Sequence, residues 1–72
     1  MDERTTAAFF KLKGILGRKD TDETLEAKSS ISVLKGNFDP EAVRELDLVA
    51  YHLDRREYDK DEEAFLNFGQ SR

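Results

Sequence analysis

The residues of this chain that could take part in chemistry are one histidine, His52, and a run of carboxylates, Asp59-x-Asp61-x-Glu63. A catalytic histidine requires a carboxylate that orients its ring and a nucleophile in a shared pocket. The carboxylate of Glu45 lies seven residues before His52 on the same helical face, and no serine stands in a G-x-S-x-G pattern. We therefore interpret His52 as a solvated surface histidine, and we expect no enzyme activity and no catalytic residue.

The carboxylate run has the spacing with which an EF-hand calcium loop begins. Such a loop also requires glycine at its sixth position and a bidentate glutamate at its twelfth, where this chain has Ala64 and Gln70. The chain contains no cysteine, and a single histidine cannot build a histidine metal site. We interpret these acids as solvated residues that favour the start of a helix, and we expect no metal site and no cofactor.

The composition describes a small, charged, acidic chain. It has 72 residues, of which 39% are charged and 38% hydrophobic, and its net charge is −4. An acidic balance repels nucleic acid and gives no attraction to an anionic membrane. No window of about 18 apolar residues is present, and the N-terminal MDERTT lacks the apolar core of a secretory signal. We expect one cytoplasmic domain over residues 1–72, with fraying ends at about 1–4 and 70–72.

Apolar residues recur at helical spacing in four segments, so we predict an all-α fold, a small bundle of three to four helices with short connections. The segment 5–18 ends near Gly17, and its stripe consists of Thr5, Ala8, Phe9, Leu12, Ile15 and Leu16. The segment 59–69 starts with Asp59 as its expected cap, and its apolar cluster consists of Ala64, Phe65 and Phe68.

The segment 40–57 is the clearest helix. Asp39 can cap it, Pro40 suits its first position, and Phe38 can pack on Val43. Its stripe consists of Ala42, Val43, Leu46, Val49, Ala50 and Leu53. Cap, stripe and length agree, so we expect this helix to be the best-protected part of the fold.

The segment 20–36 permits two interpretations. A stripe of Ala27, Ile31 and Leu34 favours a helix that begins at Asp20, Thr21 or Asp22 and stops at Gly36. Polar and apolar residues alternate over Ser30–Leu34, which leaves a short strand as the alternative.

A strand there would give the order of a ribbon–helix–helix DNA-binding dimer, a transcriptional regulator or antitoxin. In that alternative Ser30 and Ser32 could face bases. The predicted strand region carries no arginine or lysine apart from Lys35 at its end, which weighs against DNA binding. We therefore keep this interpretation second to a protein-binding one.

Several large side chains lie off the predicted stripes, and these are the candidate binding residues. Leu48, Tyr51, Arg55 and Tyr58 follow a second face of the segment 40–57, and Phe10 points away from its own stripe. Either other helices cover this second face, or it contacts a partner. Tyrosine and arginine are enriched at interface hot spots, and short chains without disulfides often dimerise.

We therefore expect a small non-enzymatic protein-binding regulator, inhibitor or adaptor that acts by occlusion through a helix face. The partner would be another protein or a second copy of the chain in a homodimer, with no membrane and, outside the DNA-binding alternative, no nucleic acid. The expected protein-binding residues are Leu48, Tyr51, Arg55, Tyr58, Phe9 and Phe10.

Overall fold

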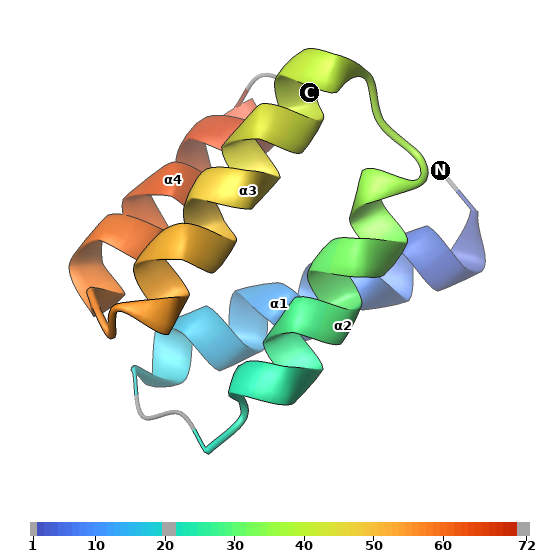
Figure 1. Ribbon diagram of the computed structural model, residues 1–72. Coiled ribbons are helices and arrows are strands. Elements are labelled where there is room, and N and C mark those ends of the chain that lie inside the picture. The colour runs from blue at the N-terminus through green and yellow to red at the C-terminus, as the bar shows by residue number, and fades with distance from the viewer. Residues whose placement is uncertain (1, 20–21, 71–72) are drawn as a thin grey trace.

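Figure 1 shows the computed structural model of the chain, which describes residues 2–19 and 22–70. Four helices connected by short segments make up this part of the chain, and it contains no strand. The helices are α1 (Glu3–Arg18), α2 (Thr24–Lys35), α3 (Pro40–Asp54) and α4 (Tyr58–Gln70). The prediction of a small all-α bundle is therefore confirmed.

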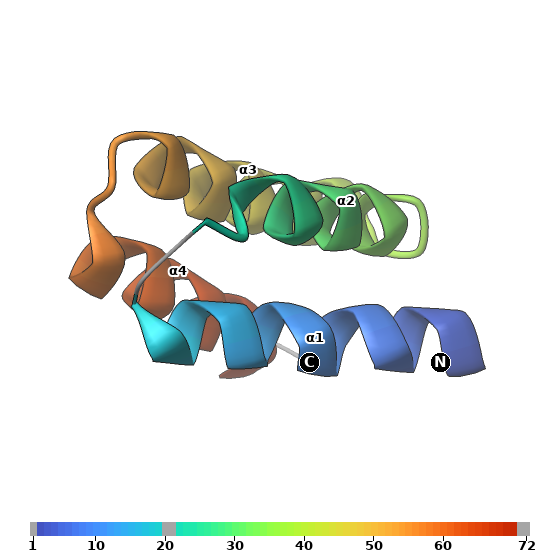
Figure 2. The same cartoon turned by 90° about the horizontal axis from the view of Figure 1, so that it is seen from below.

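The four helices form two layers, with α2 and α3 in one and α1 and α4 in the other (Figure 2). Each helix packs against two neighbours: α1 contacts α2 and α4, and α3 contacts α2 and α4. The core between the layers includes Leu12, Leu34, Leu46 and Val49, which have no exposed surface. The apolar stripe of each helix therefore faces the opposite layer, as the spacing predicts.

The predicted stripes of the first, third and fourth helices are confirmed. Their most buried members are Thr5, Ala8, Leu12, Ile15 and Leu16 in α1, Ala42, Leu46, Val49 and Leu53 in α3, and Ala64, Phe65 and Phe68 in α4. Phe9 and Ala50, at the edges of their stripes, are partly buried and pack against this core. Phe38 also packs on the core, with its ring 5.1 Å from that of Phe68 in an edge-to-face contact.

Capping side chains explain where α1 and α3 begin. Asp39 accepts a hydrogen bond from the Ala42 amide at 2.9 Å, as predicted for the start of α3. Asp2 does the same for α1, accepting from the Thr5 amide at 2.7 Å, so α1 begins at Glu3 rather than Thr5. Glu3, Arg4 and Gln70, which lie in the ends expected to fray, belong to helices in the structure. Residues 1, 71 and 72 lie outside the described chain, so for them fraying stays a prediction.

The segment 24–35 is helical, so the strand considered for Ser30–Leu34 is wrong. Ser30 is buried on the same stripe as Ala27 and Ile31, because helical spacing turns it toward the core. The ribbon–helix–helix alternative depends on that strand and loses its structural basis.

Asp22 does not cap α2. The N-cap position of α2 is held by Glu23, whose side chain makes no capping hydrogen bond. The other two cap candidates, Asp20 and Thr21, lie outside the described residues. The carboxylate of Glu23 instead pairs with Arg18 at 2.6 Å.

Two non-glycine residues with left-handed backbone angles mark the C-terminal end of α1 and the turn after α3. Lys19 has φ 56° and Arg56 has φ 57°. The α1 helix therefore continues through Gly17, which was the predicted stop. The α3 helix ends at Asp54, three residues before the predicted Glu57.

We call the connection of Arg55, Arg56 and Glu57 the elbow. Because the chain turns there, α4 starts at Tyr58, and Asp59 lies in its first turn rather than at its cap.

Candidate protein-binding face

Three of the predicted binding residues share one exposed side of the α3 helix. Leu48 is 48% exposed and Tyr51 is 54% exposed. The Arg55 guanidinium, at the end of the helix, lies over the Tyr51 ring with its carbon 5.5 Å from the ring centre. This cation–π contact holds both side chains in place. We call Leu48, Tyr51 and Arg55 the α3 face.

Tyr58 was predicted to extend this face and does not belong to it. It is the first residue of α4 and is partly buried. It lines a separate hollow beside the elbow, together with Lys19 and Lys60. The reason is the left-handed turn at Arg56, which ends the helical register that placed Tyr58 seven residues beyond Tyr51.

The two predicted phenylalanines lie in the other layer, on the α1 helix. Phe9 packs into the core with its ring 5.0 Å from that of Phe65, so it stabilises the bundle. Phe10 is 59% exposed and meets the edge of Phe9, with 5.4 Å between ring centres. Because α1 contacts α2 and α4 but not α3, the structure does not bring Phe10 together with the α3 face.

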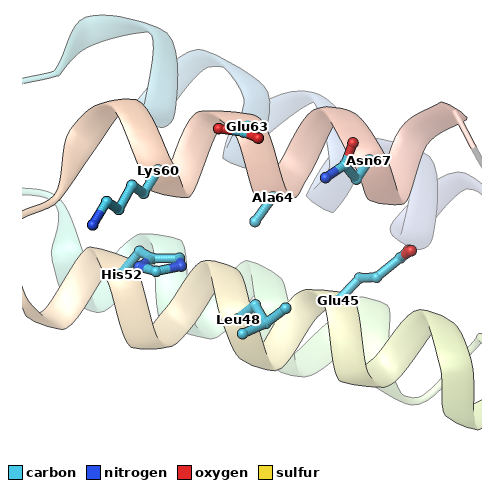
Figure 3. A pocket seen from close by; sticks show the side chains of 7 residues that line it. All are labelled: Glu45, Leu48, His52, Lys60, Glu63, Ala64 and Asn67. Carbon is cyan, nitrogen blue, oxygen red and sulfur yellow. The ribbon is translucent and has the colours of Figure 1, made fainter.

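Leu48 also borders a groove between α3 and α4, about 540 Å³ in volume. Figure 3 shows Leu48 and Ala64 facing each other across this groove, with Glu45 and Asn67 further along it. Charged groups of both signs flank the apolar centre, and the lining residues are Glu45, Leu48, His52, Lys60, Glu63, Ala64 and Asn67. The α3 face therefore adjoins a concave surface that could receive an apolar side chain from another molecule.

His52 lies in this groove, and its interpretation as a solvated histidine is wrong. Its side chain is only 21% exposed, and its Nδ1 atom is 3.0 Å from Oε1 of Glu57. Its ring also meets the edge of Tyr51, with 5.2 Å between ring centres. α4 packs along this side of α3, so the covered part of α3 is wider than its apolar stripe.

Glu57 is the carboxylate that sequence reasoning did not find for His52. The elbow folds Glu57 back beside the last turn of α3, where its backbone amide donates to the His52 carbonyl at 2.9 Å. The hydrogen bond from His52 lowers the pKa of the Glu57 carboxyl. A helical projection misses this partner because Glu57 lies beyond the end of the helix. The described residues contain no group of three or more acidic, histidine or cysteine side chains that could hold a metal ion.

Asp61 is the residue whose environment differs most from its prediction. It was interpreted as solvated, yet it has no exposed surface, and neither of its carboxylate oxygens has a hydrogen-bond partner. Burial raises the pKa of Asp61 to about 6, while the backbone amide of Glu62 acts in the opposite direction. The signal for this burial was its position, because Asp61 precedes Ala64, Phe65 and Phe68 by three, four and seven residues.

The two acids on either side of Asp61 are exposed, as predicted. Asp59 has a side chain that is 92% exposed and pairs with Lys19 at 3.2 Å, and Glu63 is also exposed. The three carboxylates therefore do not converge as calcium ligands would. They lie on different sides of the first two turns of α4.

Comparison with known proteins gave no relative: no protein-family model, no curated protein and no solved structure matches this chain. Among the described residues, no helix has the length and apolar character needed to cross a membrane.

Proposed function

We propose that this protein is a small non-enzymatic regulator, an inhibitor or adaptor, which binds another polypeptide chain through the α3 face and blocks the surface that it covers. The observation that supports this most directly is the stacking of Arg55 on the exposed ring of Tyr51, beside the half-exposed Leu48. Tyrosine and arginine together on a rigid element are typical of interface hot spots. A cytoplasmic location is part of the proposal, since a chain without cysteine suits a reducing compartment.

The surroundings of the α3 face favour binding at low entropic cost. The helix is capped at its start by Asp39, and the Arg55 guanidinium is held by both Tyr51 and Glu57. Side chains that are already ordered lose less freedom when a partner binds. One well-buried anchor of this kind can contribute 2 kcal/mol or more, about thirty-fold in affinity.

The first experiment locates the binding surface. A photo-reactive phenylalanine derivative replaces Tyr51 in one variant, which keeps an aromatic ring on the α3 face. In a control variant it replaces Leu25, which is 82% exposed on α2. Each is irradiated in an extract of the cells that make the protein. The proposal expects a discrete cross-linked polypeptide from position 51 and none from position 25. Equal capture at both positions would contradict it.

The second experiment measures affinity for the captured polypeptide after purification. Tyr51→Ala combined with Arg55→Ala should weaken binding at least thirty-fold while circular dichroism stays unchanged, because neither side chain is in the core. Leu66→Ala is the matched control, since Leu66 is 53% exposed on α4. Unchanged affinity in the double variant would assign the interface to another surface, beginning with Phe10.

A further inference from the structure

Two residues of α3 and the residue that caps its C-terminal end repeat at an interval of seven and lie in one row along the helix. They are Glu41, Leu48 and Arg55. Glu41 is exposed in the first turn, Leu48 is 48% exposed, and the Arg55 side chain is 58% exposed at the end of the helix. Seven residues are nearly two full helical turns, so the row stays on one side of the helix. It presents a negative charge, an apolar side chain and a positive charge in that order.

This row is complementary to itself when it is reversed. If two α3 helices lie antiparallel with their Leu48 side chains in contact, Glu41 of each copy faces Arg55 of the other. Each pair then lies about 10 Å from the central leucines, given a rise of 1.5 Å per residue.

We propose that the polypeptide which occupies the α3 face is a second copy of this chain, bound antiparallel about a two-fold axis that passes beside Leu48. This inference rests on the proposed function and names its partner. The charges select the direction: a parallel pair would place Glu41 against Glu41 and Arg55 against Arg55, and like charges in contact disfavour association. A two-fold pair also makes each favourable contact twice.

The groove between α3 and α4 supplies the apolar part of this interface. Leu48 faces Ala64 across the groove, so the leucine of the second copy can pack against both side chains (Figure 3). Arg55 contacts Glu57 through its Nε atom at 3.3 Å, and its guanidinium carries two further nitrogens that can donate to Glu41 of the second copy. One pair of helices buries less than a standard interface, so the dimer is expected to be reversible and to weaken with salt.

Introduced cysteines test the geometry directly, because the chain contains none of its own. Leu48→Cys should form a disulfide-linked homodimer under mild oxidation. A mixture of Glu41→Cys and Arg55→Cys chains should form the mixed dimer. Glu41→Cys alone should not link to itself, since two such residues would be about 21 Å apart, and a disulfide needs Cα atoms within about 7 Å. Leu25→Cys controls for random collisions.

A charge exchange tests the chemistry. Glu41→Arg and Arg55→Glu should each weaken self-association about tenfold, because each change sets like charges against each other twice in the dimer. The double variant restores opposite charges and should recover association. Glu3→Arg is the matched control, as it makes the same change in the first turn of α1. Circular dichroism of every variant shows whether the monomer remains folded.

The outcomes separate this inference from the function on which it rests. Dimers in sedimentation equilibrium, with the linking pattern above, support it. Self-linking of Glu41→Cys, or a double variant that stays as weak as the single ones, overturns the antiparallel arrangement. A chain that remains at 8.3 kDa up to several hundred micromolar overturns self-pairing altogether. In that case a different polypeptide captured at position 51 preserves the proposed function, and an absence of any capture removes both.

Discussion

His52 Nδ1 lies 3.0 Å from Oε1 of Glu57, and this contact ties the last turn of α3 to the elbow that leads into α4. The Glu57 carboxylate also forms ion pairs with Arg55 at 3.3 Å and Lys60 at 3.5 Å, so three basic side chains surround it. Glu57 therefore links the last turn of α3 to Lys60 in the first turn of α4.

Glu57→Gln should lower the free energy of unfolding, with a dependence on pH. The pKa of Glu57 is lowered in the folded protein, chiefly by the hydrogen bond from His52. A lowered carboxyl pKa stabilises the fold above the ordinary glutamate range, and this stabilisation is lost as the pH falls through the folded-state pKa. Urea denaturation should therefore separate the wild type from the variant at pH 6, and the separation should shrink as the pH falls below the ordinary glutamate range. The exposed Glu63→Gln should show no such convergence.

Asp61→Asn should have the opposite effect to Glu57→Gln and should stabilise the protein relative to the wild type as the pH rises. The pKa of Asp61 is raised by burial to about 6, so its proton stabilises the fold at low pH, and this stability is lost as the pH rises toward 6. Between pH 4 and pH 7 the shift predicts a roughly fifty-fold fall in the folded-to-unfolded ratio from this one group. The difference between Asp61→Asn and the wild type should grow in favour of the variant over that range. Asp59→Asn, which alters an exposed carboxylate two residues before Asp61, should show no such trend.

The charged groups around Asp61 do not offset the rise that burial causes in its pKa. α4 packs only against α1 and α3 among the described helices. From α3, His52 lowers the pKa of Asp61, whereas Glu62 and Asp59 on its own helix raise it. Lys19, at the end of α1, is near enough for Asp61 to raise the lysine pKa, but Asp59 is its ion-pair partner. A pH profile of Asp61→Asn that runs parallel to the wild type would show that Asp61 reaches water in solution.

Leu46→Ala should destabilise the protein by about 2–5 kcal/mol, as is usual for a buried leucine. Leu46 has no exposed surface and lies at the centre of the core that α3 shares with the opposite layer. Leu66→Ala removes the same atoms from a side chain that is 53% exposed, and it should cost less than about 0.5 kcal/mol. Chemical denaturation of both variants tests the assignment, and a loss under about 1 kcal/mol for Leu46→Ala would place it outside the core.

Arg56→Gly should stabilise the protein by up to about 1 kcal/mol, because φ 57° is a left-handed angle that costs little only for glycine. Arg44→Gly makes the same chemical change inside α3, where glycine should cost about 1 kcal/mol instead. Thermal unfolding of the two variants should therefore shift in opposite directions. A lower melting temperature for Arg56→Gly would show that its side chain contributes more than the backbone angle costs.

The amino-acid sequence by itself determined α1, α3 and α4, their core-facing stripes and the cap of α3, and it left a strand open within α2. These features depend on local rules: residues three and four apart share a helix face, and an aspartate before a first turn accepts an amide proton. Leu46 and Phe68 were placed correctly in the core for this reason, and Leu48, Tyr51 and Arg55 were placed correctly together on a second face.

Only the tertiary structure decided what each remaining side chain meets. The left-handed Arg56 removed Tyr58 from the α3 face and brought Glu57 to His52, and a single backbone angle of this kind has no reliable sequence signal outside glycine. Asp61 is buried in the bundle, where α4 packs against α1 and α3, although an aspartate in a first turn normally faces water. A helical projection describes one helix, whereas burial and partners depend on how the neighbouring helices pack against it.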